Sequence, residues 1–321
     1  MSRARRIEDL EPFLPGLKTL LEDPEVSELM INGPCNVWVE REGRLYPHSA
    51  PRLTEHVLDR AAIQIARPLR LDPRETSIID ARLEDGSRVA ISVPPASPET
   101  VITVRRFGNR SFSAPDLVRM GSLPAAVLAK AQELLRSRRN ILVSGGTGSG
   151  KTTLLNALID LLPPNGRIVS IEDTLELKVT RPNSIRFEAG QLDGNNGKAR
   201  LTIRDLVRHA LRHRPDHIVV GEVRGGEAAD LLQALNTGHG GSLTTIHANN
   251  AEAALSRLAN CAMQDGGALP WEVTCRNVVD GIAMVIHLTR REGKRFVEEA
   301  IEVGGYDSAR KRFTFKPVAL E

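Results

Sequence analysis

The stretch Gly145-Gly146-Thr147-Gly148-Ser149-Gly150-Lys151-Thr152 decides the fold of this chain. It fits the pattern G-x-x-x-x-G-K-[ST] of a phosphate-binding P-loop. Residues 140–144 before it form an apolar run typical of a buried strand, and residues 153–162 after it have helical spacing. The loop therefore has the strand and helix context that the motif requires, and a glycine-rich turn of another kind fits less well.

The residue types in this loop suit a polyphosphate ligand. Glycines permit a sharp turn that points backbone N–H groups at phosphate oxygens, and the helix N-terminus adds positive potential. We expect Lys151 to reach the β- and γ-phosphates and the Thr152 hydroxyl to ligate Mg²⁺. The sequence thus predicts ATP and Mg²⁺ as cofactors, with ATP contacts extending from Gly145 to Thr153.

Length and composition indicate a globular protein with room for two domains. The 321 residues include 43 basic and 40 acidic ones, a formal net charge of +3. So small a charge gives no support for direct nucleic-acid binding. The basic residues 1–6 are not followed by an apolar segment, and no apolar run approaches the roughly 18 residues of a membrane span. Three cysteines without metal-ligand spacing predict reduced thiols in a cytosolic protein.

The hydrophobic pattern divides the chain. Residues 1–108 combine strand patterns with a helix at 54–66, which predicts a smaller α+β domain with a mostly antiparallel sheet. Residues 109–122 are polar and predict a linker that holds a short helix. In residues 123–321 strands alternate with helices, which predicts an α/β, RecA-like P-loop domain with a mainly parallel sheet. Its expected strands are 140–144, 167–172, 184–188, 217–222, 241–246 and 282–288, followed by a terminal hairpin of 295–302 and 312–316.

Two of these strands end in acidic residues. Glu172 ends one strand and is followed by Asp173 and Glu176, while Glu222 ends another in the manner of a Walker B acid. Ligands of open parallel sheets bind beyond the carboxyl ends of the strands, so the first group could hold Mg²⁺ or orient water. Asp173 could instead cap the next turn. Glu222 could contact Mg²⁺ through water, polarise the attacking water, or do both.

Histidines and arginines add further candidates. His239 and His247 bracket the strand at 241–246, and either could sense the γ-phosphate or bond to Glu222. Metal ligation by them is disfavoured because no other ligand stands at a suitable spacing. Arginine suits bidentate phosphate recognition, although solvated strand edges are an equally good explanation for those of the first domain. These are Arg82, Arg88, Arg105 and Arg106.

Together, these motifs resemble the secretion-system ATPases of the type II/type IV superfamily. The resemblance rests on the P-loop, an Asp box at 171–176, a Walker B segment at 220–224 and a His box at 237–249. The short N-terminal region, without a tetracysteine insertion, is similar to the conjugal-transfer, TrbB-like branch. The Asp box reads Glu-Asp-Thr where pilus motors have Glu-Asp-Pro, which fits that branch.

The resemblance implies properties that the motif spacing does not show. Members form homo-hexameric rings in the bacterial cytoplasm, peripheral to the inner membrane, and work with inner-membrane components of a secretion or conjugation machine. ATP binds between their two domains, whose closure drives the machine. The implied roles are hydrolysis for Lys151 and Glu222, the Asp-box acid for Glu172 or Glu176, coupling for His239 and His247, phosphate contacts for Arg88, Arg105 and Arg106, and Mg²⁺ contacts for Thr152, Glu222 and Glu172.

Three functions follow as hypotheses. The first is an ATPase motor that powers pilus assembly or substrate transfer by a type IV secretion or conjugal-transfer apparatus. The second is a nucleotide-gated scaffold for secretion components, with incidental hydrolysis. The third, a DNA-translocating motor, is disfavoured by the weak net charge and the lack of an aromatic and basic groove pattern. The acids at two strand ends favour the first.

Overall fold

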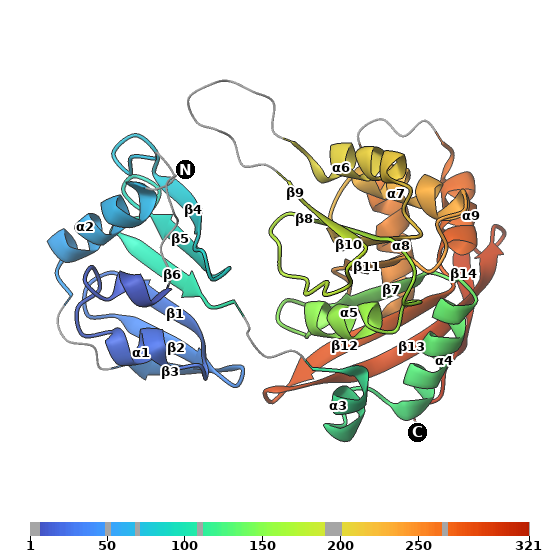
Figure 1. Ribbon diagram of the computed structural model, residues 1–321, viewed down its shortest axis with the longest axis horizontal. Coiled ribbons are helices and arrows are strands. Elements are labelled where there is room, and N and C mark those ends of the chain that lie inside the picture. The colour runs from blue at the N-terminus through green and yellow to red at the C-terminus, as the bar shows by residue number, and fades with distance from the viewer. Residues whose placement is uncertain are drawn as a thin grey trace. The chain divides into compact units, whose positions relative to one another are not determined.

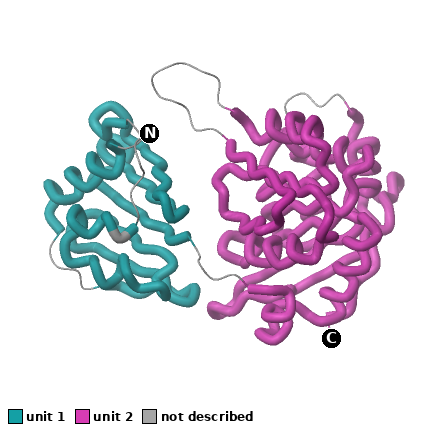
Figure 2. The backbone as a smooth tube through the Cα atoms, viewed as in Figure 1, with its two compact units in different colours: residues 1–109, 193–197 teal, residues 110–192, 198–321 magenta. Residues whose placement is uncertain are grey.

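A computed structural model describes residues 7–48, 53–67, 71–107, 112–189, 201–264 and 269–320. The described residues form two compact units, one up to residue 107 and the other from residue 112 (Figure 2). The stretch predicted as a linker contributes helix α3 (Ala114–Arg119), and its Ala114 and Leu117 are buried in the core of the second unit. Among the described residues, no helix is long and apolar enough to cross a membrane.

The first unit is a six-stranded antiparallel sheet of order β3-β2-β1-β6-β5-β4, covered by helices on one face (Figure 1). Apolar residues alternate along its strands, so one side of each strand packs against the helices. The longest helix begins where the Thr54 hydroxyl accepts the Val57 N–H. Its elements are η1 (Ile7–Leu10), α1 (Lys18–Glu22), β1 (Val26–Asn32), β2 (Val37–Arg41), β3 (Arg44–His48), α2 (Glu55–Ala66), β4 (Ile78–Arg82), β5 (Arg88–Ser92) and β6 (Val101–Arg105).

The second unit is an eight-stranded sheet of order β14-β13-β12-β7-β11-β10-β8-β9. The pairs from β12 to β9 are parallel, and those that involve β13 and β14 are antiparallel. Its elements besides α3 are α4 (Ala125–Arg136), β7 (Ile141–Gly145), α5 (Lys151–Ile159), β8 (Ile168–Glu172), β9 (Ser184–Glu188), α6 (Ile203–Ala210), η3 (Leu211–His213), β10 (His217–Val223), α7 (Glu227–Asn236), β11 (Leu243–Ile246), α8 (Ala251–Ala262), α9 (Trp271–Gly281), β12 (Met284–Arg291), β13 (Lys294–Asp307) and β14 (Arg312–Pro317).

Helices cover both faces of this sheet (Figure 1). Ile141 and Val143 of β7 pack with α3, α4 and α5, whereas Leu142 between them packs with the helices from α6 to α9. A strand that is buried on both faces must be apolar throughout, which is why β7 and β8 stand out in the sequence as continuous apolar runs. The mainly parallel sheet and its terminal hairpin confirm the predicted mixed α/β architecture. Strand β12 continues to Arg291, beyond its predicted end at residue 288.

Candidate active site

The P-loop joins β7 to α5, and two of its glycines are required by geometry. Gly150 precedes the helix with φ +98°, in the left-handed region. A Cβ on Gly145, where φ is +153°, would lie 2.4 Å from the carbonyl oxygen of Leu288 on β12. Neither position accepts a side chain without strain. The loop is therefore a tight turn that packs directly on the neighbouring strand.

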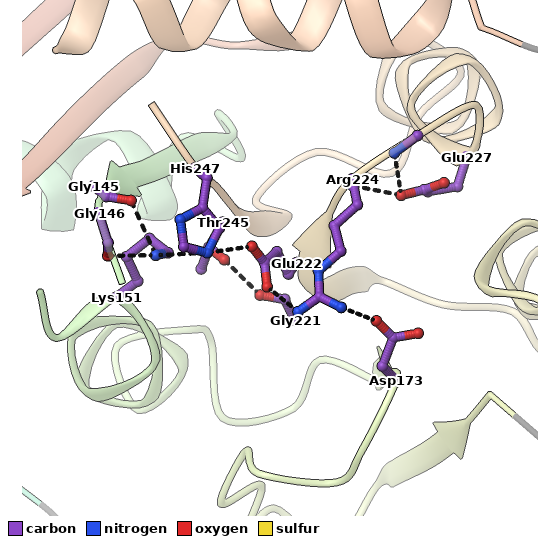
Figure 3. Close-up of polar contacts among 11 residues, drawn as sticks. Gly145, Gly146, Lys151, Asp173, Gly221, Glu222, Arg224, Glu227, Thr245 and His247 are labelled. Carbon is purple, nitrogen blue, oxygen red and sulfur yellow. Dashed lines mark hydrogen bonds and ion pairs between the residues drawn. The ribbon is translucent and has the colours of Figure 1, made fainter. Parts of the chain in front are cut away.

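Lys151 is held at the mouth of this loop. Only 8% of the residue is exposed. Its Nζ donates to the carbonyl oxygens of Gly145 at 3.0 Å and Gly146 at 2.9 Å, and it lies 3.3 Å from Nε2 of His247 (Figure 3). Neutral carbonyls bind an ammonium less strongly than anionic oxygens do. The side chain can therefore exchange these partners for a phosphate.

An irregularity in β10 aims Glu222 at the same place. Val220 pairs with Thr244 and Val223 with Ile246, so that Gly221 and Glu222 together face Thr245. The Thr245 hydroxyl donates to the carbonyl of Gly221 at 2.7 Å. Such a bulge bends a strand and redirects its side chains. The Glu222 carboxylate consequently lies at the end of β11, with Oε1 2.7 Å from Nε2 of His247.

The two oxygens of Glu222 have different surroundings (Figure 3). Oε2 accepts a 2.6 Å hydrogen bond from Arg224, whose other terminal nitrogen donates to Asp173 at 2.9 Å. Oε1 is close to His247, yet it lacks a partner with hydrogen-bond geometry among the described residues. That contact is thus a short electrostatic approach rather than a directed bond. Arg224 fixes one oxygen, and the other is buried beside His247 without a hydrogen bond in the described part of the chain.

His247 stands between a cation and an anion. Burial is the largest cause that lowers its pKa, Lys151 lowers it further, and Glu222 acts in the opposite direction. With a pKa below the ordinary value of 6.5, the imidazole is neutral at pH 7. A neutral ring can link Lys151 and Glu222 without adding charge to the site.

The Asp-box acids differ in their roles. Glu172 is 3% exposed, and its Oε2 accepts the backbone N–H groups of Glu176 at 2.6 Å and Leu177 at 2.8 Å. Burial raises the pKa of Glu172, although these hydrogen bonds oppose the shift. Glu172 thus shapes the turn after β8 through Oε2, and its role as a metal ligand stays a prediction. Glu176 contributes its backbone to that turn, and Asp173 is the acid that joins Glu222 through Arg224.

The sheet separates the two predicted histidines. His247 follows the carboxyl end of β11, whereas His239 precedes its amino end. The Nδ1 of His239 lies 3.1 Å from the Ala234 carbonyl at the end of α7, and its own carbonyl accepts the Ser242 hydroxyl at 2.7 Å. Because β7 and β11 are parallel, the P-loop lies at the other edge. The structure therefore places His247 beside Lys151 and Glu222 and places His239 at the opposite edge of the sheet.

The predicted arginines of the first unit also differ. The Arg106 guanidinium donates to the carbonyl of Val26 at 3.1 Å and to that of Leu21, so it is bound to its own unit. Arg88 and Arg105 are directly opposite each other on β5 and β6. Their neighbours Val89 and Val104 are buried, so the arginines lie on the face away from the core. Arg82 pairs with Arg88 in the same way, so Arg82, Arg88 and Arg105 share a sheet face from which an anion could be bound.

The residues fit Mg²⁺ without a preformed metal cage. No group of three or more His, Cys, Asp or Glu side chains converges on a metal position in the described ranges. Mg²⁺ does not need one, because it keeps several waters and binds phosphate oxygens with one or two protein ligands. Glu222 Oε1 lacks a hydrogen-bond partner among the described residues, and Thr152 stands in the first turn of α5. These are the oxygens that could hold the ion.

Comparison with known proteins agrees with this arrangement. The family described as type II/IV secretion system protein matches residues 14–316. This chain belongs to that family. The conjugal transfer protein TrbB of Rhizobium radiobacter is 33% identical over 291 residues, which cover 89% of this chain and 86% of the relative. The type IV secretion system protein PtlH of Bordetella pertussis is 33% identical over 317 residues, covering 90% and 93%.

This type II/IV secretion system protein shares its fold with a protein of solved structure. The ATPase DotB of Yersinia pseudotuberculosis superposes with a TM-score of 0.64 at 20% identity, covering 89% of this chain and 77% of that one. The family match over residues 14–316 and the relatives at 33% identity confirm the resemblance deduced from the four motifs.

Sequence reasoning missed several residues of this secretion-system protein. Arg224 stands two residues after the Walker B acid, so its position in the motif could have indicated its role. Thr245 gave no such signal, because its function depends on the bulge in the facing strand. Arg295, which donates to the carbonyl of Gly148 at 2.8 Å, comes from a hairpin far along the chain. Residues of this kind can be found only once strand order is known.

Proposed function

We propose that this secretion-system protein hydrolyses ATP to ADP and phosphate and thereby powers a type IV secretion or conjugal-transfer apparatus, in pilus assembly or substrate transfer. The observation that carries the proposal is the series Lys151, His247 and Glu222, joined by distances of 3.3 Å and 2.7 Å. It brings a cation suited to phosphates and a carboxylate suited to water to one edge of a parallel sheet.

In the proposed reaction, Lys151 leaves the loop carbonyls and binds the β- and γ-phosphate oxygens. Glu222 Oε1 orients a water and accepts its proton while the water oxygen attacks the γ-phosphorus. The bond between that phosphorus and the bridging oxygen breaks, and ADP retains the electron pair. Arg224 keeps the other carboxylate oxygen fixed during this step. Mg²⁺, when bound through Thr152 and Glu222, would neutralise phosphate charge.

The proposal extends to assembly and coupling. We infer a homo-hexamer on the cytoplasmic side of the inner membrane that works with inner-membrane secretion components and does not bind nucleic acid directly. Hydrolysis would be coupled to movement between domain 1–108 and domain 123–321, and helix α3 of the proposed linker 109–122 would move with the second domain because it packs in the core of the second unit. The names of the relatives TrbB and PtlH support the secretion role, and the opposed Arg88 and Arg105 support a phosphate contact from the first domain.

Turnover of purified protein tests the proposal. Glu222→Gln should retain nucleotide binding and lose about a hundredfold or more in kcat, because the base is removed. Lys151→Ala should lose binding. Glu133→Gln is a matched control, since that glutamate is exposed on α4. Wild-type turnover no higher than that of Lys151→Ala would contradict hydrolysis.

The nucleotide-gated scaffold makes a different prediction in cells. A scaffold needs nucleotide binding alone, so Glu222→Gln would still support secretion or transfer. A motor needs turnover, and we therefore expect Glu222→Gln to fail in a complementation assay while it accumulates to the wild-type level.

A further inference from the structure

The hairpin of β12 and β13 extends past the P-loop. Strand β12 pairs with β7 up to Leu288, which is opposite Gly145, where β7 ends. It then continues to Arg291, and β13 returns from Lys294 (Figure 1). The tip of the hairpin consequently runs beside the phosphate loop rather than beside another strand of the parallel sheet.

Two arginines on one face of this hairpin approach the loop. Arg290 and Arg295 are directly opposite each other. Arg295 Nε donates to the carbonyl of Gly148 at 2.8 Å. A Cβ on Gly148 would lie 3.1 Å from Arg290 Nη1, and one on Gly150 would lie 3.5 Å from Arg295 Cδ. Both guanidinium groups therefore lie against the segment whose N–H groups are expected to face phosphates.

The other face of the hairpin carries a second pair of basic residues, which can be compared with Arg290 and Arg295. Arg291 and Lys294 are paired with each other, next to the first pair. Successive residues of a strand point to opposite faces, so Arg291 is directed away from the face of Arg290. Arg291 forms an ion pair with Glu298 and lies over the ring of Phe296. Arg291 thus carries the same charge as the neighbouring Arg290, but it lies on the other face of the hairpin and is paired with Glu298.

Charge placed in this way suits a polyphosphate. Like charges directly opposite each other on a hairpin are unfavourable, and an anion between or beside them relieves the repulsion. A guanidinium has five donors in a planar fork that matches phosphate oxygens. The hydrogen bond to the Gly148 carbonyl uses Nε of Arg295, the nitrogen nearest the side-chain stem, and not the two terminal nitrogens of the guanidinium.

Strand order places these arginines on the β12 side of the P-loop. In the series β12-β7-β11-β10, the P-loop follows β7, and the arginines come from the β12 side. His247 follows β11 and Glu222 lies on β10, on the opposite side of β7. The arginines are thus separated from the residues that would act on the terminal phosphate.

We propose that Arg290 and Arg295 form a second cationic wall of the nucleotide site and bind the polyphosphate of ATP and ADP from the flank opposite Glu222. They set affinity for the nucleotide and leave the hydrolytic step to Glu222. This inference rests on the proposed function, because it presumes that the P-loop binds ATP.

Calorimetric titration of the full chain with ADP and Mg²⁺ tests the proposal. We expect Arg295→Ala to raise Kd about tenfold, and the double variant with Arg290→Ala to raise it further. Arg291→Ala should remain within about twofold of wild type, since its partner is Glu298. The dependence of Kd on salt should weaken in the double variant as well.

The outcomes separate this inference from the proposed function. If wild-type protein binds ADP and the double variant binds it equally well, the second cationic wall does not exist. A lower unfolding temperature in Arg295→Ala with unchanged Kd would overturn it too, because Arg295 would then only brace the loop. If wild-type protein binds neither ADP nor ATP, the proposed function itself fails.

Discussion

The Nε2 atom of His247 lies 2.7 Å from Oε1 of Glu222. The same nitrogen is 3.3 Å from Nζ of Lys151, so one imidazole edge faces both a cation and an anion. A neutral ring tolerates both neighbours. A protonated ring would add a positive charge beside Lys151 and would pair with the carboxylate that is needed for water.

This relationship predicts an acid limb in the pH profile. The pKa of His247 is lowered by burial and by Lys151, so protonation occurs below the ordinary value of 6.5. We expect kcat/KM to fall as pH decreases below that value, because the charged ring occupies Glu222. In His247→Asn the overall rate should be lower and this limb should be lost. An unchanged acid limb in His247→Asn would show that another group controls it.

Two adjacent threonines provide a matched test of the bulge in β10. Thr245 donates to the carbonyl of Gly221 at 2.7 Å, and Thr244 donates to that of Val220 at 3.0 Å. Replacing either with valine should cost about 1–3 kcal/mol of unfolding free energy, because a buried carbonyl loses its donor. Only Thr245→Val should also lower kcat, since Gly221 adjoins Glu222. Equal kcat values for the two variants would contradict the role of the bulge.

The first two glycines of the P-loop should respond differently to alanine. A Cβ on Gly145 would lie 2.4 Å from the backbone of Leu288, whereas one on Gly146 would meet no atom within 4 Å. We therefore expect Gly145→Ala to lower the unfolding free energy by about 2 kcal/mol or more. Gly146→Ala should stay within about 0.5 kcal/mol of wild type. Denaturant unfolding without nucleotide measures both, and equal losses would argue against the close contact with β12.

Buried His217 predicts a loss of stability in mild acid. The residue is 0% exposed, and burial is the largest cause that lowers its pKa from 6.5. Below that value the unfolded chain binds a proton that the folded chain does not. The contribution of His217 to the unfolding free energy is therefore complete above pH 6.5 and declines as pH falls. The slope of unfolding free energy against pH that is attributable to His217 should be at most about 1.4 kcal/mol per pH unit.

Urea unfolding at several pH values measures this slope. His217→Asn should flatten it relative to wild type, whatever its own stability, because both proteins contain the same acids. A variant with the wild-type slope would contradict the assignment. The bond between Nδ1 of His217 and the Gly241 carbonyl, 3.1 Å long, acts against the shift but does not reverse it.

Local patterns determined much of what the sequence revealed. The P-loop, the apolar strands beside it and the acids at strand ends depend on residues that are close in the chain, and hydrophobic periodicity exposes them. The capping box at Thr202 and Asp205 is another local feature, because its two residues are three positions apart in the chain. These signals sufficed for the mixed α/β architecture and for the secretion-system family.

Long-range features had no such signal. His239 and His247 are equivalent in the sequence, because both flank one strand. The parallel direction of β7 and β11 alone decides that His247 meets Lys151. Arg106 was grouped with Arg88 and Arg105 by its position, yet only folding shows that it is bound to the Val26 carbonyl.

The sequence by itself determined that a phosphate loop lies at the end of a buried strand and that two further strands bring acids to the same edge. Tertiary structure decided which side chains meet there. A bulge opposite Thr245 aims Glu222, and the order β12-β7-β11-β10 places Arg290 and Arg295 on the other flank of the loop. The physical reason is that periodicity fixes which face a residue occupies, whereas register and strand order fix its neighbours.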